Sequence, residues 1–257
     1  MILLQIPERR RSVDVAVIGL RGSELELHEV STTVLPVAAA QTAAEYVAEF
    51  QPDAAAGKVH TLTLPGSVPN TVLVAGLGER TTDELRVAGV AIGRAISKLP
   101  DGKTFAVAID APEAAQSKAL AEGLVLGGYS FTLASKADDH LHTLDLVGDL
   151  DRAGLSAGDE AADAAGWARD LGNTPANDLN PARLGELAVD QLTPAGCTVT
   201  VRDETWLAEQ GFGGVLAVGG ASASAPRLIE VRYAARRRRG APKPPHVVLV
   251  GKGITFD

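Results

Sequence analysis

The sequence predicts an α/β protein, made of an N-terminal α/β domain, a linking helix and the beginning of a second α/β domain. In the first half, short apolar runs rich in β-branched residues alternate with segments of helical periodicity, which is the pattern of layered α/β folds. Residues 148–158 are polar and contain glycine, as expected of a domain boundary. Beyond them the alternation resumes and reaches residue 257 with its last elements incomplete.

Four strands are expected in the first half, at residues 13–18, 71–75, 104–109 and 141–147. Two helices are expected between them. Residues 83–99 carry apolar side chains at helical spacing. The second helix begins at Pro112, a residue suited to a first helical turn, and runs through Leu124. Strands interleaved with helices favour a parallel or mixed sheet.

The second half begins with a helix at residues 159–171, which the sequence Asn-Thr-Pro at 173–175 should stop, because a residue before proline is pushed out of the helical region. Asn180 as N-cap and Pro181 at the first helical position predict the next helix. Strands are expected at 197–202, 227–233 and 246–250, with a short helix at 204–210. The run at 246–250 is continuously apolar, like a central buried strand. The predicted domains are therefore 1–150, a linker helix at 151–175, and 176–257.

The net charge, the cysteine count and the lengths of the apolar runs indicate which classes of protein this chain could belong to. The formal net charge is -8 and the isoelectric point is about 5.2. An acidic chain repels phosphate backbones, so the composition argues against nucleic acid as a partner. Cys197 is the single cysteine, so no disulfide can form within the chain, which fits a reducing compartment. The apolar run at residues 1–4 is too short for a signal peptide, and no stretch is long enough to span a membrane. A cytoplasmic protein is expected.

Lys252 and Asp257 form the sharpest candidate pair for chemistry. They follow the apolar run at 246–250, and open α/β sheets bind ligands at the carboxyl ends of their strands. Aspartate is a hard oxygen ligand for divalent metals. A lysine amine must be neutral to donate its lone pair, and a nearby dication can remove the proton because it penalises the ammonium form. On chemistry alone, a lysine and an aspartate that follow a strand are more often solvated, or form an ion pair with each other, than bound to a metal.

Four other motifs favour a structural interpretation. Gly251-Lys252-Gly253 lacks the upstream glycine and the Ser/Thr of a phosphate loop. Gly76-Leu77-Gly78 lacks the third glycine of a dinucleotide fingerprint, so a tight turn is expected there. His140 and His142 share one face of a strand but have no nearby partners for zinc, which favours a surface strand edge. The arginine run at 236–239 is expected to be a solvated loop.

Several longer strings resemble the leucyl aminopeptidase family, also named cytosol aminopeptidases. The signature that joins the two domains of that family resembles NTPANDLNPARL at residues 173–184. The start of its metal-binding motif resembles VGKGITFD at 250–257, and the segment ahead of it resembles GFGGVLAVGGASASAPRLIEVRY at 211–233. In the first half, VLVAGLGE at 72–79 and EGLVLGGYSF at 122–131 also resemble the family.

The resemblance implies a macro-domain-like N-terminal domain, a linker helix and a catalytic metallopeptidase domain. It implies a homo-hexamer that releases N-terminal residues from peptides, with leucine preferred, by means of two divalent metal ions (Mn²⁺ or Zn²⁺, also Mg²⁺). By position, Lys252 matches the lysine that ligates one metal and Asp257 matches the aspartate that bridges both. Two such ions would polarise the substrate and lower the pKa of a shared water.

The remaining acidic ligands and the catalytic residues of the family lie beyond the position of Asp257, so no catalytic residue is expected within this chain. We therefore expect the 257-residue chain to be truncated within its active site and inactive alone. Two alternatives stay open. The N-terminal domain could be a nucleotide or ADP-ribose binding module through its fold likeness. The chain could instead be an assembly or DNA-binding regulatory protein that uses the arginine run at 236–239.

Overall fold

The computed structural model describes residues 1–8, 12–22, 26–27, 30, 33–133, 142–234, 240 and 245–255. The chain divides into two compact units, Met1–Asp170 and Leu171–Asp257, and each is described by itself. The domain boundaries at residues 150 and 175 stay predictions. None of the helices in the described part of the chain combines the length and the apolar character that a bilayer crossing needs.

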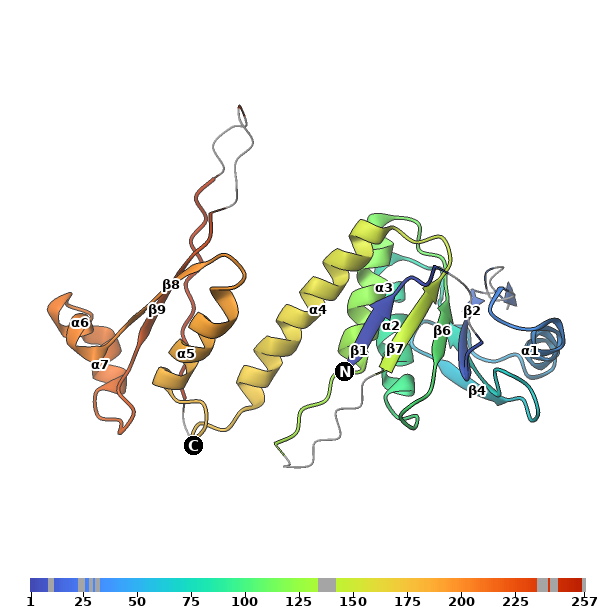
Figure 1. Cartoon of the computed structure of the whole chain (residues 1–257), viewed down its shortest axis with the longest axis horizontal. Coiled ribbons are helices and arrows are strands. Elements are labelled where there is room, and N and C mark those ends of the chain that lie inside the picture. Colours follow the sequence, from blue (N-terminus) through green and yellow to red (C-terminus); the bar gives the residue numbers. More distant parts are fainter. Residues whose placement is uncertain are drawn as a thin grey trace. The chain divides into compact units, whose positions relative to one another are not determined.

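The first unit is built on one mixed β-sheet (Figure 1). Its elements in chain order are β1 (Ile2–Gln5), β2 (Val15–Arg21), β3 (Glu26–Leu27), α1 (Val37–Phe50), β4 (Val59–Thr63), β5 (Thr71–Gly76), α2 (Thr82–Ile96), β6 (Phe105–Ala108), α3 (Ala114–Gly127), β7 (His142–Val147) and α4 (Arg152–Asn173). The strand order is β1-β7-β6-β2-β5-β4. All neighbours in this path are parallel except β4, which runs antiparallel to β5. The predicted α/β fold class is confirmed.

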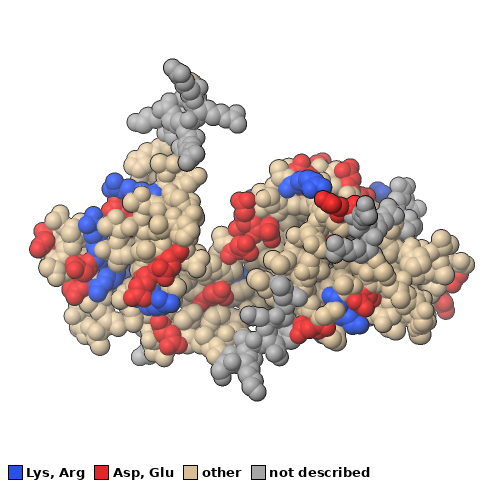
Figure 2. All heavy atoms as spheres, viewed as in Figure 1, with Lys and Arg blue, Asp and Glu red and all other residues tan. Residues whose placement is uncertain are grey.

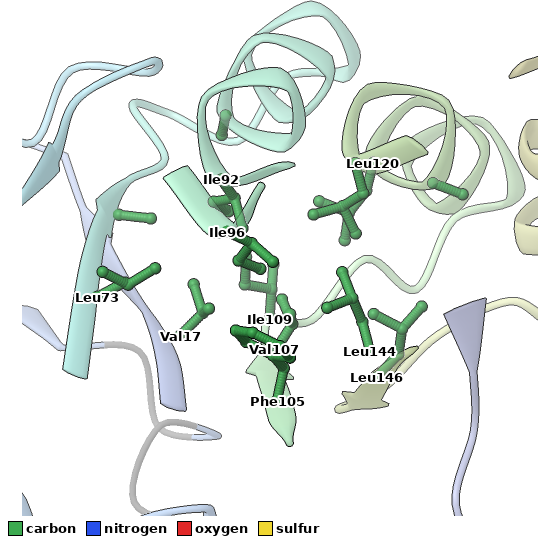
Figure 3. Close-up of a cluster of buried hydrophobic side chains, with 14 of the residues drawn as sticks. Val17, Leu73, Ile92, Ile96, Phe105, Val107, Ile109, Leu120, Leu144 and Leu146 are labelled. Carbon is green, nitrogen blue, oxygen red and sulfur yellow. The ribbon is translucent and has the colours of Figure 1, made fainter. Parts of the chain in front are cut away.

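Helices cover both faces of this sheet. Successive residues of β2 point to opposite faces, because side chains alternate along a strand: Val17 belongs to one buried cluster and Ile18 to the other. The first cluster lies under α2 and α3, which contribute Ile92 and Leu120 among others (Figure 3). The second lies under α1, on the opposite side of the sheet (Figure 1). The result is a three-layer core that fixes the carboxyl ends of the parallel strands.

Glycines let α2 and α3 approach each other backbone to backbone. A Cβ atom on Gly93 would meet the carbonyl oxygen of Leu124, and one on Gly127 would meet that of Val90, both well inside contact distance. A Cβ atom on Gly89 would lie 2.7 Å from the carbonyl oxygen of Leu120. Backbone atoms cannot swing aside as side-chain ends can, so this close packing requires glycine.

Helix α4 begins earlier than the helical pattern at residues 159–171 predicts, close to the start of the linker helix proposed for 151–175. Residues 152–158 were expected to be part of a polar boundary, but they form the first two turns of Arg152–Asn173. The Asp151 side chain accepts a hydrogen bond from the Gly154 amide at 2.6 Å, as an N-cap residue does. A Cβ atom on Gly154 or Gly158 would strike a carbonyl oxygen of α3. These glycines therefore mark close helix packing at the start of α4, and the domain boundary at residue 150 stays a prediction.

The second unit contains smaller elements: α5 (Pro181–Leu192), β8 (Thr198–Arg202), α6 (Glu204–Glu209), α7 (Gly213–Gly219) and β9 (Leu228–Arg232). The two strands pair antiparallel, with Val199 opposite Val231 and Val201 opposite Ile229. Helix α5 packs against β8, where a Cβ atom on Gly185 would lie 2.9 Å from the Val201 side chain. The predicted helix at 204–210 and the predicted strands at 197–202 and 227–233 are confirmed to within a residue or two.

The predicted central strand at 246–250 is wrong for this structure. Residues 245–255 have no helix or strand, and Val247 to Val250 are exposed. A strand needs hydrogen-bonding neighbours, and an apolar strand also needs cover on both faces. Among the described residues, β8 and β9 pair with each other and no strand pairs with 246–250. The apolar run is present in the sequence, but the described strands do not include the neighbours that would pair with it and bury it.

Candidate functional site

The signature at residues 173–184 forms a turn between two helices. The amides of Asp178 and Leu179 donate to the Pro175 carbonyl at 3.0 and 2.8 Å, and Leu179 is buried. The Asn180 side chain then accepts from the Arg183 amide at 3.0 Å, and Pro181 occupies the first turn of α5. The predicted N-cap is confirmed. In this structure, the polar residues of the signature serve to fix the path of the chain from the end of α4 into α5.

The candidate metal ligands lie at the end of the described chain. Lys252 is exposed within the irregular segment 245–255, and Asp257 lies outside the described residues. Their proximity to each other stays a prediction. No cluster of three or more His, Cys, Asp or Glu side chains able to hold a metal ion occurs in the portion that the structure describes. The described residues alone therefore do not fit a two-metal centre, and no step of a reaction is derived through one.

His142 lies in a different environment from the one that was predicted. His140 falls outside the described residues, and His142 is 2 % exposed in β7, with its ring 5.2 Å from that of Phe105. Strand β7 lies between β1 and β6, so it is not an edge strand. The expectation of a surface strand edge was wrong because β1, which the sequence did not reveal, pairs with β7 from Ile2 to Gln5.

The carboxyl ends of β2 and β5 border a cavity of about 410 Å³. Its lining includes Gly22 and Gly78, which follow these two strands, and the carboxylates of Asp53, Glu79 and Glu84. Hydrogen bonds from Thr81 hold the pKa of Glu84 below its usual value, so this carboxylate stays ionised near neutral pH. Asp53 and Glu79 come from two separate loops and Glu84 from the first turn of α2, and sequence spacing could not show that all three line one cavity.

This acidic edge bears on the alternative of nucleotide or ADP-ribose binding. Open α/β sheets bind ligands at this edge, but phosphate groups require donors and positive charge there. The expected tight turn after β5 is confirmed, because Gly78 has a φ of +57° and the Arg80 amide donates to the Leu77 carbonyl at 3.1 Å. Carboxylates beside that turn repel a pyrophosphate. The described geometry does not favour the nucleotide alternative.

The alternative of DNA binding gains no support from the described surface. The arginine run at 236–239 lies outside the described residues. On the face shown in Figure 2, acidic and basic side chains are interspersed. Several of the basic groups are paired, such as Arg86 with Glu122 and Arg183 with Glu186. Mixed and mutually paired charges of this kind do not favour binding to a phosphate backbone.

The sequence matches two models of one protein family. The model described as the cytosol aminopeptidase family, N-terminal domain, matches residues 17–135. The model described as the cytosol aminopeptidase family, catalytic domain, matches residues 166–257. The second match contains both the signature at 173–184 and the residues Lys252 and Asp257.

Similar proteins carry the same family name. A probable cytosol aminopeptidase of Roseiflexus castenholzii is 37 % identical over 75 % of this chain and 42 % of its own length. One of Leifsonia xyli is 34 % identical over 98 % of this chain and 49 % of its own length. The chain thus spans about half the length of these relatives.

Solved structures of other proteins share the fold of this chain. The bottromycin maturation enzyme BotP superposes with a TM-score of 0.67 at 25 % identity, over 86 % of this chain and 46 % of BotP. A tomato leucine aminopeptidase variant superposes with a TM-score of 0.69 at 21 % identity, over 92 % of this chain and 52 % of its own, which shows a shared fold. Together with the two family models, which cover most of the chain, these matches establish that the chain belongs to the cytosol aminopeptidase family.

Proposed function

We propose that this chain is part of a metal-dependent aminopeptidase that releases N-terminal residues, leucine preferred, from peptides. The observation that carries the proposal is the match of the catalytic family model to residues 166–257, which end in the string VGKGITFD. The relatives named probable cytosol aminopeptidases support the same reaction class. Peptides are the substrates proposed. A cytoplasmic location and a homo-hexamer of the longer protein also belong to the proposal.

Lys252 and Asp257 are the proposed metal ligands, and two divalent ions are the proposed cofactors. A neutral lysine amine leaves a metal more electrophilic than a carboxylate does, and an aspartate has two oxygens with which to bridge a pair of ions. One similar structure, BotP, is described in complex with Mn, which supports Mn²⁺ as a candidate beside Zn²⁺ and Mg²⁺. When bound, such ions supply an activated water and a charge that stabilises an oxyanion.

The proposal assigns the chain an N-terminal domain at residues 1–150, a linker helix at 151–175 and part of a catalytic domain at 176–257. Two protein ligands are too few for a pair of metal ions, since each divalent ion prefers four or more. We propose that the further ligands come from outside residues 1–257. We accordingly propose that the 257-residue chain alone does not hydrolyse peptides.

A hybrid chain tests this function. Residues 1–257 would be joined at the equivalent position to the remaining half of a relative such as the Leifsonia xyli protein, and hydrolysis of leucine p-nitroanilide would be measured with added Mn²⁺. The folded hybrid is expected to be active, and the 257-residue chain is expected to be inactive. Robust turnover by the 257-residue chain would contradict the need for further residues. An inactive hybrid with a native circular dichroism spectrum would contradict the proposed function.

A further inference from the structure

The carboxylate of Asp159 lies against an apolar part of the first unit. Asp159 is partly buried in α4 and lines a cavity of about 190 Å³. The lining also includes Leu4 of β1, Ile6 just after that strand, Leu146 of β7 and Leu155 of α4. An ionised carboxylate beside such side chains loses part of its hydration, and this loss disfavours the charged form.

Close packing of α4 against α3 keeps Asp159 in this position (Figure 1). Gly158 precedes it, and a Cβ atom on Gly158 would lie 2.3 Å from the carbonyl oxygen of Lys118 in α3. A Cβ atom on Gly154, about one turn earlier, would lie 2.3 Å from the carbonyl oxygen of Ala114. Because the two backbones are in contact at both glycines, α4 cannot rotate Asp159 towards water without losing this packing.

The charged groups around Asp159 do not compensate for the lost hydration. Burial, and after it the negative charges of Asp163 and Glu160, raises the pKa of the Asp159 carboxyl above its usual 3.8. Arg152 lines the same cavity and Lys118 lies on α3, but neither forms an ion pair with Asp159 in the part of the chain that the structure describes. The described lining residues from β1, β7 and the segment after β1 are uncharged. The ionised carboxylate is therefore an unfavourable element of the contact beneath α4.

We propose that protonation of Asp159 strengthens the attachment of α4 to the first unit, so that the start of this helix opens less readily in mild acid than at neutral pH. A neutral carboxyl needs less hydration and no longer repels the acidic side chains beside it. The pKa is raised in the folded state, so the folded state binds the proton first as the pH falls, and its stability rises through that window. The gain is absent at neutral pH. This inference is independent of the proposed function, because it uses neither a metal ion nor a substrate.

Amide hydrogen exchange in α4, measured by mass spectrometry on the 257-residue chain and on the hybrid chain, tests the proposal. After correction for the intrinsic pH dependence of exchange, the protection of residues 154–163 is expected to rise at least about threefold between about pH 7 and about pH 4.5. Asp159→Asn imitates the neutral carboxyl. It should raise the protection at neutral pH by a similar factor and remove the further increase in acid.

The matched control is Glu45→Gln, which removes one negative charge from an exposed position of α1 and keeps an acceptor for the Gln41 side chain. It should leave the exchange of α4 and its pH dependence unchanged. Asp163→Asn removes only the repulsion, so it should raise the protection at neutral pH less than Asp159→Asn does. Protection of α4 that stays constant or falls in mild acid would overturn the proposal. So would an Asp159→Asn variant that exchanges like the wild type at neutral pH, or a Glu45→Gln control that changes α4 as strongly.

Discussion

Gly93 and Gly172 both lie in helices, but a methyl group added at the two positions is expected to have different effects on stability. A Cβ atom on Gly93 would strike the carbonyl oxygen of Leu124. At this point the backbone of α2 packs directly against the backbone of α3, so neither side can move away. We expect Gly93→Ala to lower the free energy of unfolding by about 1–3 kcal/mol, the usual cost of overpacking a tight contact. Urea unfolding followed by circular dichroism measures it.

The control for this prediction is Gly172→Ala in α4, where nothing lies within 4 Å of the added Cβ atom. Alanine there improves helix propensity, so stability should stay the same or rise by up to about 1 kcal/mol. Equal effects of the two substitutions would show that the α2–α3 contact is looser than described.

Asp14 provides a pH-dependent contribution to stability. Its carboxylate accepts from the amide and the hydroxyl of Thr104 at 2.9 and 2.8 Å, and Lys103 lies 3.7 Å away. These hydrogen bonds, more than the charge of Lys103, hold the pKa of Asp14 below its usual 3.8. Because the pKa is lower in the folded state, the contribution is present above 3.8 and is lost as the pH falls through the folded value.

We therefore expect the difference in stability between the wild type and Asp14→Asn to shrink as the pH drops from neutral to below 3.8. The measurement is urea unfolding at several pH values. A difference that stays constant over this range would show that the hydrogen bonds to Thr104 do not depend on the ionised carboxylate.

Single residues of the candidate site were predictable to different degrees. Asn180 was identified as an N-cap because its role depends only on neighbours in sequence, and the structure confirms it. The environment of His142 was not predictable, since it depends on β1, which lies 140 residues away in the chain. Lys252 was identified through a family motif, and its local chemistry alone did not distinguish a ligand from a solvated side chain.

At the scale of elements, the start of α2 depends on a capping box. The Thr81 hydroxyl accepts from the Glu84 amide at 3.3 Å, and the Glu84 carboxylate accepts from the Thr81 amide at 3.0 Å. We expect Thr81→Ala to cost about 1 kcal/mol of stability, because it leaves a helix amide without its capping partner. Thermal unfolding measures it.

Thr42→Ala is the matched control, since Thr42 lies inside α1 and donates to the Ala38 carbonyl. Alanine is the better helix former at such a position, so no loss of stability is expected. If Thr81→Ala were as harmless as Thr42→Ala, the capping box would not stabilise the helix.

Elements were predictable where their pattern is local and strong. The four apolar runs of the first half became β2, β5, β6 and β7, and the amphipathic segment at 83–99 became α2. The short edge strands β1 and β4 were not identified, because edge strands are partly exposed and lack a continuous apolar signal. The run at 246–250 shows the converse, since an apolar pattern predicts a buried strand only when its neighbours are present.

At the scale of the whole molecule, the fold and the candidate site follow from different parts of the chain. The mixed sheet between helices could be predicted from alternation of elements, and the structure confirms it. The candidate site could be predicted only as two ligands, because a two-metal centre needs side chains brought together by tertiary structure. The chain spans about half the length of its relatives, and the described residues do not bring such a set together.

The central proposal is that Lys252 and Asp257 are metal ligands. The most direct test is to measure manganese binding by the hybrid chain. Calorimetric titration of the hybrid should give two Mn²⁺ ions per chain. Lys252→Ala and Asp257→Ala should each remove or strongly weaken at least one of them, whereas Lys98→Ala, at an exposed position just after α2, should leave both unchanged. Unaltered Mn²⁺ stoichiometry and affinity in both Lys252→Ala and Asp257→Ala would contradict the account.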